Sequence, residues 1–251
     1  MKSVFKAKSL TKKSSKADAE SELRGSLKEQ AGKDLGKKGK VKEFAGGYSP
    51  NKAINIILKY DNYIDDVSKG YGVNKALIQS LLFRELICYD ALDVAADKAV
   101  MEYFSYKQRL EDYKKTKWYI QILTGAPTPN GMMREDCSTG LGQIFARTAI
   151  GAINYGITNK KLMFDADNWK VRRQIWNSLH NDDEYTVRTI AKILIKEADG
   201  INKINLKSPK SNHAKLVLAR YNLSGRKKAG NYGKSCYRYY KLFKKYNKAV
   251  K

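Results

Sequence analysis

The stretch Ala76-Leu-Ile-Gln-Ser-Leu-Leu-Phe-Arg-Glu-Leu-Ile-Cys-Tyr-Asp90 predicts a buried helix that carries one carboxyl group. Read as a helix, Glu85 lies three residues after Leu82, four after Leu81 and seven after Ile78, so it shares their apolar face. Burial disfavours the charged form of a carboxyl group, which raises its pKa and lets it keep a proton at neutral pH. Glu85 is therefore a candidate general acid. The alternative is that Glu85 lies at the rim of the helix and pairs with a lysine or arginine.

The composition describes a folded and strongly basic chain. Its 251 residues are 42% hydrophobic, which is enough for a packed core in one substantial domain or two small ones. The formal net charge of +24 indicates a polyanionic partner: nucleic acid, an anionic membrane surface or an acidic cell-wall polymer. Charge alone does not choose among these three.

The first 47 residues differ in texture from the rest of the chain. They are rich in Lys, Ser, Ala and Gly, so residues 1–47 are expected to form a basic flexible extension or docking segment, with a helical piece near 17–31. Lysines interrupt the N-terminus where a secretory signal would have its apolar core. We therefore expect synthesis in the cytoplasm without a signal peptide, followed by delivery through another export route or by lysis. No membrane span is expected.

Residues 48–251 show the spacing of a mostly α-helical domain. Ser49 is a predicted N-cap with Pro50 at the first helical position, and apolar residues at helical spacing continue to Val67. One long helix or two shorter ones fit residues 91–123, and a short hairpin is expected between Pro127 and Asp136. The remaining helices are predicted at 171–179, 183–198, 214–221 and 232–246.

Neither a metal site nor a cofactor is expected. Cys88, Cys137 and Cys236 lack the paired spacing of a zinc site and are too few for a disulfide framework. His180 and His213 are far apart in sequence, and neither lies in a carboxylate cluster. A serine or cysteine nucleophile would also need a histidine partner, and the sequence indicates none.

Three segments in order resemble the lytic transglycosylase and goose-type lysozyme superfamily. They are Glu85 near the end of its helix, Ser138-Thr-Gly-Leu-Gly-Gln-Ile-Phe-Ala-Arg-Thr-Ala149, and Leu218-Ala-Arg-Tyr-Asn-Leu-Ser-Gly225. That family carries a catalytic Glu, a Gly-Leu-Met-Gln turn leading into a helix, an Ala-Tyr-Asn-Ala-Gly segment and a tyrosine-bearing C-terminal helix. The stretch from Tyr232 to Tyr240 is similar to that closing helix.

The resemblance implies a lysozyme-like helical domain that cleaves peptidoglycan. By position, Glu85 would be the general acid, while Gly140, Leu141, Gln143, Tyr221 and Asn222 would bind the sugar. The expected activity is that of a bacteriolytic, antimicrobial muramidase, a glycosidase acting on the β-1,4 bond between N-acetylmuramic acid and N-acetylglucosamine. Its origin would be a phage or an exported bacterial effector.

The reaction course depends on a second carboxylate. An inverting hydrolase uses a second acid to activate water, whereas a lytic transglycosylase lets a hydroxyl of the substrate attack and leaves an anhydro-sugar end. Glu135 and Asp136 precede the glutamine turn, close to where goose-type lysozymes place an auxiliary Asp, so either is a candidate for positioning water. A solvated loop pair is the alternative for both.

Two other functions remain open at this point. Leu86 and Gly142 depart from the family pattern, which would suit an inactive lysozyme-like structural module. A basic nucleic-acid-binding protein would use the lysine-rich N-terminus and the tyrosine-rich last helix, although no nucleic acid is expected as the partner. The expected partners are peptidoglycan and anionic cell-wall polymers, together with a delivery machine or an immunity protein.

Overall fold

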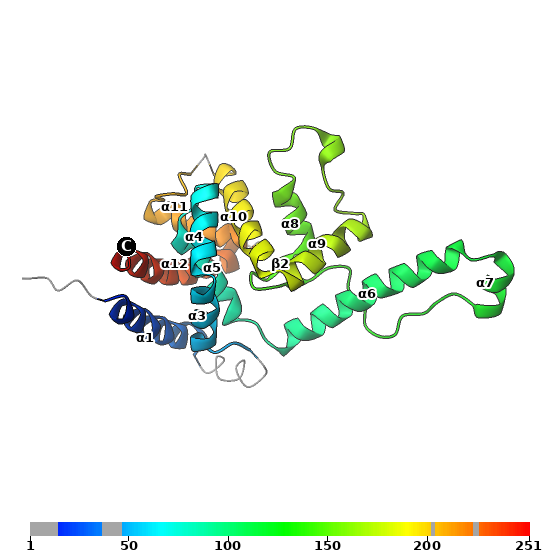
Figure 1. Ribbon diagram of the computed structural model, residues 1–251, viewed down its shortest axis with the longest axis horizontal. Coiled ribbons are helices and arrows are strands. Elements are labelled where there is room, and N and C mark those ends of the chain that lie inside the picture. Colours follow the sequence, from blue (N-terminus) through cyan, green and yellow to red (C-terminus); the bar gives the residue numbers. More distant parts are fainter. Residues whose placement is uncertain (1–14, 37–46, 202–203, 223–225) are drawn as a thin grey trace, which may run out of the picture.

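The protein is mostly helical and contains one small sheet. The structure is a computed structural model that describes residues 15–36, 47–201, 204–222 and 226–251, with the side chains of 226–229 left out. Within these ranges the helices and the single two-stranded antiparallel sheet confirm the mostly α-helical prediction (Figure 1). The elements are α1 (Lys16–Leu35), α3 (Pro50–Lys59), α4 (Asp61–Tyr71), α5 (Lys75–Leu86), α6 (Ala91–Lys115), α7 (Trp118–Thr124), β1 (Ser138–Thr139), β2 (Ile144–Phe145), α8 (Ala146–Ile153), the 3-10 helix η1 (Lys160–Leu162), α9 (Trp169–Asn181), α10 (Asp183–Asp199), α11 (Ser211–Tyr221) and α12 (Arg226–Ala249).

Helix α5 is the central element of the core. It begins after Asn74, whose side chain accepts a hydrogen bond of 3.1 Å from the backbone N–H of Ala76. Helices α3, α4, α10, α11 and α12 all pack against it. Phe83 meets Tyr239 of α12 edge-on, with ring centroids 4.8 Å apart. Because partners surround α5, its side chains are buried on nearly every face.

The predicted helix over 50–67 is two helices in the structure. Ser49 caps α3 and Pro50 occupies its first turn, as predicted. The chain then bends at Tyr60, which ends α3 and precedes α4. The Tyr60 hydroxyl donates a 2.6 Å hydrogen bond to Asp183 at the start of α10, so a tertiary contact fixes the bend. Helical spacing continues across this bend, which is why the sequence pattern did not reveal it.

Helix α1 belongs to the packed structure, although it lies in the segment expected to be a flexible extension. Its Leu23 and Leu27 side chains are buried in the same core as those of α5, and α1 packs on α12 and α3. The helical piece predicted near 17–31 is therefore present and longer. The edge of the packed structure does not coincide with the expected boundary at residue 47. Residues 1–14 and 37–46 of that expected extension lie outside the described residues.

Helices α6 and α7 form an arm that projects from the body of the molecule (Figure 1). Helix α6 opens with a capping box. The Asp93 side chain accepts a hydrogen bond from the backbone N–H of Asp90, and the Asp90 side chain accepts one from the backbone N–H of Leu92. Of the two patterns considered for residues 91–123, the structure shows a long helix followed by a short one. Helix α7 lies at the far end of this arm.

The hairpin lies further along the chain than expected. Ser138 pairs with Phe145 and Thr139 with Ile144, so the tight turn is formed by residues 140–143. Between Pro127 and Asp136 the structure describes no strand, so the predicted location of the hairpin was wrong.

None of the helices in the described part of the chain combines the length and the apolar character that crossing a membrane requires.

A buried carboxylate links α1 to α12. The Ser235 hydroxyl donates a 2.7 Å hydrogen bond to Asp34, and Arg238 forms an ion pair with the same group. Burial alone would raise the pKa of Asp34, but the interactions with Ser235, Tyr239 and Arg238 together outweigh it and hold that pKa below its ordinary value. The ionised form of Asp34 therefore stabilises the folded state at neutral pH.

Replacing this carboxylate tests whether α1 is part of the domain. We expect Asp34→Asn to lower the free energy of unfolding by about 1–3 kcal/mol at pH 7, because Arg238 loses its partner. Since the folded-state pKa is depressed, this difference should begin to shrink as pH falls below about 4, where the unfolded state takes up the proton, and should vanish only below the folded-state pKa, where both states are protonated. Urea unfolding of the wild type and of Asp34→Asn at several pH values measures this difference in the free energy of unfolding.

The control is Glu22→Gln, which removes the exposed ion pair between Glu22 of α1 and Lys245 of α12. This change should cost less than about 1 kcal/mol because solvent screens the pair. Equal and negligible effects of both substitutions would contradict the docking of α1 on α12.

Candidate active site

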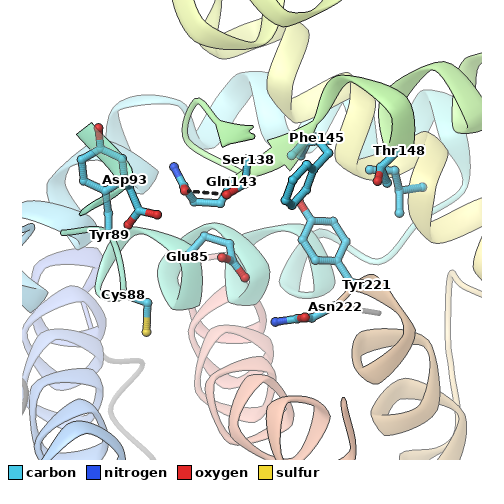
Figure 2. Close-up of a pocket in the computed structure, with 12 residues that line it drawn as sticks. Glu85, Cys88, Tyr89, Asp93, Ser138, Gln143, Phe145, Thr148, Tyr221 and Asn222 are labelled. Atoms are coloured by element: carbon cyan, nitrogen blue, oxygen red, sulfur yellow. Dashed lines mark hydrogen bonds between the residues drawn. The ribbon is translucent and has the colours of Figure 1, made fainter. Parts of the chain in front are cut away.

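A cleft lies beside the end of α5 and is here called the Glu85 cleft. Its volume is about 520 Å³. Its walls come from α5, the start of α6, the hairpin, α8, α10 and the end of α11, which are far apart in the sequence. Figure 2 shows the side chains that face it. Its polar lining includes Glu85, Asp93, Ser138, Gln143, Tyr221 and Asn222.

Glu85 lies in the last turn of α5 and is half-buried. As predicted, Leu81 and Leu82 on the same face are fully packed. The hydroxyl of Tyr232, on α12, donates a hydrogen bond to Oε1 of Glu85. Burial raises the pKa of Tyr232 well above its ordinary value, and the neighbouring Cys236 and Glu85 side chains raise it further, so this hydroxyl keeps its proton. The bond fixes the orientation of the Glu85 carboxyl group.

Tyr221 ends α11 and connects that helix to the turn of the hairpin. Its hydroxyl donates a 2.7 Å hydrogen bond to the carbonyl oxygen of Gly142. Burial raises the pKa of Tyr221 well above its ordinary value, and the nearby Glu85 adds to the effect. The hydroxyl is thus a permanent donor, which anchors the turn beside the cleft. Asn222, the next residue, also faces the cleft (Figure 2).

The turn at residues 140–143 places Gln143 in an uncommon backbone conformation. Gln143 has φ 47°, the one positive φ among the described residues that are not glycine. Its Nε2 donates to the carbonyl oxygen of Gly140 at 3.0 Å, and its Oε1 accepts from the Ser138 hydroxyl at 3.3 Å (Figure 2). These bonds hold the amide at the wall of the cleft. Strained backbone of this kind persists only where its surroundings fix it, and it clusters at functional sites.

Gly140 is required by a close approach of the turn to α9. Its φ is +68°, and a Cβ atom here would lie 2.1 Å from the carbonyl oxygen of Leu179. Gly142 is less restricted, because a Cβ there would meet flexible side-chain atoms at 3.1 Å. The two glycines therefore have different reasons for being glycine. Gly140 lets the hairpin pack on α9, whereas Gly142 leaves room for the closely packed side chains of Ile144, Thr186 and Ile190.

A smaller pocket of about 160 Å³ adjoins the Glu85 cleft and shares Glu85 and Gln143 with it. Gly140 and Leu141 line this pocket together with Asp97, which is buried in α6. Asp97 lies 3.7 Å from Nδ1 of His180, which in turn is 2.9 Å from the Thr139 hydroxyl. This polar group ties α6, α9 and β1 together behind the turn.

Cys137 completes this group as a buried thiol. Its Sγ donates to Asp97 over 3.4 Å. Burial, followed by the charge of Asp97, raises the pKa of Cys137 to about 12, so the thiol stays protonated. Cys137 therefore packs as a free, protonated thiol.

Glu135 and Asp136 do not line the Glu85 cleft but an adjoining pocket, which shares Phe145 and Thr148 with it. The two carboxylate oxygens of Asp136 accept hydrogen bonds of 3.0 Å from the backbone N–H groups of Ala146 and Arg147, which caps α8. Burial raises the pKa of Asp136 even though those backbone bonds oppose it. Glu135 forms ion pairs with Arg147 and Arg172 at 3.6 and 3.7 Å.

The structure thus brings together part of the predicted site. Glu85, Gln143, Tyr221 and Asn222 share one cleft, while Gly140 and Leu141 border the adjoining pocket. The end of the third motif, residues 223–225, lies outside the described residues.

The sequence prediction missed Asp93, which lines the cleft, and Tyr232, which donates a hydrogen bond to Glu85. The sequence singles out neither residue, because Asp93 has the position of a helix-capping residue and Tyr232 is one of several tyrosines in the last helix.

No known protein family, curated protein or solved structure matches the chain. What the site does must therefore be argued from its geometry and from the residues that form it.

Substituting Gly140 tests the close approach of the turn to α9. We expect Gly140→Ala to destabilise the protein by at least about 3 kcal/mol, because it combines positive φ with a clash against backbone. The control Gly131→Ala, whose Cβ would meet nothing within 4 Å, should change stability by less than about 1 kcal/mol. Urea unfolding compares them. Two equally mild variants would contradict the placement of the turn.

Proposed function

We propose that this protein is a peptidoglycan-cleaving muramidase in which Glu85 is the general acid. The bond cleaved would be the β-1,4 linkage between N-acetylmuramic acid and N-acetylglucosamine. The observation that carries the proposal is the meeting of Glu85, Gln143, Tyr221 and Asn222 in one cleft from three distant segments. Those are the segments through which the sequence resembles the lytic transglycosylases and goose-type lysozymes.

The environment of Glu85 suits the transfer of one proton. Oε1 of Glu85 accepts from Tyr232, so a proton on the carboxyl group is carried by the other oxygen, Oε2. In a bound glycan that proton would pass to the glycosidic oxygen as the bond from this oxygen to the anomeric carbon breaks. The electron pair of the bond leaves with the oxygen, and an oxocarbenium-like centre forms on the muramic acid sugar. Tyr232 holds the acid in one orientation during this step.

Neutral hydrogen-bonding groups around Glu85 suit a sugar ligand. Gln143, Tyr221 and Asn222 carry no charge, and the amide of Gln143 is fixed by the turn. Phe145 contributes an exposed aromatic ring to the same wall. Sugar sites combine fixed polar groups with apolar surface in this way. The net charge of +24 would also attract the protein to anionic wall polymers.

The placement of the carboxylates favours lytic transglycosylation over hydrolysis. Glu135 and Asp136 lie in another pocket, and Asp136 uses both oxygens to cap α8. Among the described residues of the Glu85 cleft, Asp93 is the other carboxylic acid, and one of its oxygens accepts from the backbone N–H of Asp90. We therefore propose that a hydroxyl of the same sugar attacks the anomeric carbon and returns its proton to Glu85. The product would be an anhydro-sugar end.

Removing the acid is the first test. We expect Glu85→Gln to reduce the lysis of purified cell walls by at least about 100-fold, because glutamine cannot donate a proton of suitable acidity. The fold should persist, since the amide oxygen still accepts from Tyr232. The matched control is Glu135→Gln, the same chemical change outside the cleft, which should retain activity. Turbidity loss measures both, and activity retained by Glu85→Gln would contradict the mechanism.

The masses of the released fragments decide the reaction course. We expect fragments lighter by one water molecule than hydrolytic products, because the sugar hydroxyl takes the place of water. Asp93→Asn should then leave the product unchanged and activity within about tenfold of the wild type. Products with ordinary reducing ends, together with a much larger loss in Asp93→Asn, would instead show that Asp93 activates water.

A further inference from the structure

Helix α7 presents an apolar surface that nothing in the described structure covers. It reads Trp-Tyr-Ile-Gln-Ile-Leu-Thr, and none of its residues is buried. Trp118 is 72% exposed, Ile122 72% and Leu123 83%. Exposed apolar residues scattered singly are ordinary, but a cluster on one short helix marks an interaction site. We call this cluster, formed by Trp118, Tyr119, Ile120, Ile122 and Leu123, the arm tip.

The arm tip is held in place by specific hydrogen bonds. Nε2 of Gln121 donates to the carbonyl oxygens of Tyr113 and Thr116, each at 3.0 Å, and the Tyr113 hydroxyl donates to the carbonyl oxygen of Gln121 at 3.1 Å. Polar bonds thus attach α7 to the end of α6, while the apolar side chains point to solvent. This arrangement gives the apolar residues no role in the protein's own core.

The chain that returns from the tip is also fixed to α6. Glu102 accepts a 2.8 Å hydrogen bond from the backbone N–H of Asn130 and forms an ion pair with Arg109. Arg109 in turn donates to the carbonyl oxygen of Thr128. Hydrogen bonds and an ion pair therefore hold the two sides of the arm together, and the arm carries the tip away from the body of the molecule (Figure 1).

The charge next to the arm tip is mostly positive; the acidic residue nearest in sequence is the exposed Asp112, which lies 4.0 Å from Lys115. Between Asp112 and Glu135 the sequence contains no acidic residue, whereas Lys114, Lys115 and Lys117 directly precede α7. All three lysines are exposed. Lysine next to Trp, Tyr, Ile and Leu is the composition that binds the interface of an anionic bilayer. The aromatic and aliphatic groups enter the headgroup region there, and the ammonium groups meet lipid phosphates.

We propose that the arm tip binds the surface of an anionic lipid bilayer. Trp118, Ile122 and Leu123 insert at the level of the headgroups, and Lys114, Lys115 and Lys117 pair with anionic lipid. The helix does not span the membrane, since its seven residues are far too short. This interaction is independent of the proposed muramidase activity, because the tip lies outside the Glu85 cleft.

Vesicle flotation with the full chain tests the proposal. The probes are vesicles of phosphatidylcholine alone and vesicles that also contain phosphatidylglycerol. We expect at least about tenfold tighter binding to the anionic vesicles, weakened by added salt. Trp118→Ser/Ile122→Ser/Leu123→Ser should reduce that affinity at least about tenfold. The control Leu162→Ser/Phe164→Ser/Leu216→Ser removes exposed apolar groups elsewhere and should bind like the wild type.

A second pair of variants separates the tip lysines from the general positive charge. Lys114→Gln/Lys115→Gln/Lys117→Gln should weaken binding more than Lys28→Gln/Lys160→Gln/Lys161→Gln, which removes the same charge at exposed positions outside the arm. Equal losses in the two triple variants would overturn the specific role of the tip.

Three further results would also overturn the proposal. They are no wild-type binding to anionic vesicles, unchanged binding in the apolar tip variant, and a tip variant that alters only self-association in sedimentation velocity. The last would assign the tip to a second copy of the chain. Because the vesicles contain no glycan, Glu85→Gln should bind them like the wild type, so failure here and failure of the muramidase proposal are distinguishable.

Discussion

The burial of helix α5 on nearly all sides is the constraint on which the site depends. Five helices pack around it, so its last turn has a fixed position at the floor of the cleft. Leu86 and Ile87 are buried directly after Glu85, which anchors the C-terminal end of the helix. Glu85 is the one carboxylic acid of this helix. A carboxyl group there is held by the core on one side and exposed to a ligand on the other.

The hydrogen bond from Tyr232 extends this constraint to the last helix. Helix α12 packs on α5, α11 and α1, and Tyr232 lies on its inner face. The same helix meets Asp34 of α1 through Ser235 and Arg238. The N-terminal helix and the acid are therefore attached to one common element. Loss of α1 would loosen the helix that orients Glu85.

Much of the fold could be predicted from the sequence. Helical spacing identified most of the helices, and Ser49 and Pro50 marked where α3 begins. The break at Tyr60 could not be predicted, because it depends on a partner more than a hundred residues away. The membership of α1 in the core was hidden by the lysine-rich composition around it, although Leu23 and Leu27 lie four residues apart on one face.

The candidate site was predicted where the sequence carries local chemistry and missed where it depends on tertiary contacts. Glu85, Gln143 and Tyr221 stood out by type and order, and they do share a cleft. Glu135 and Asp136 were chosen for their nearness in sequence to the turn, but they line an adjoining pocket, where Asp136 is bound to the start of α8. Tyr232 is distinguished from the other tyrosines of its helix only by what it contacts.

The most direct measurement is the incubation of the purified full chain with purified peptidoglycan, followed by mass analysis of the soluble fragments. Glycosidic cleavage by Glu85 predicts the release of disaccharide-peptide fragments cut between muramic acid and glucosamine. A properly folded protein that binds the wall but releases no such fragment would contradict the enzyme account of this cleft.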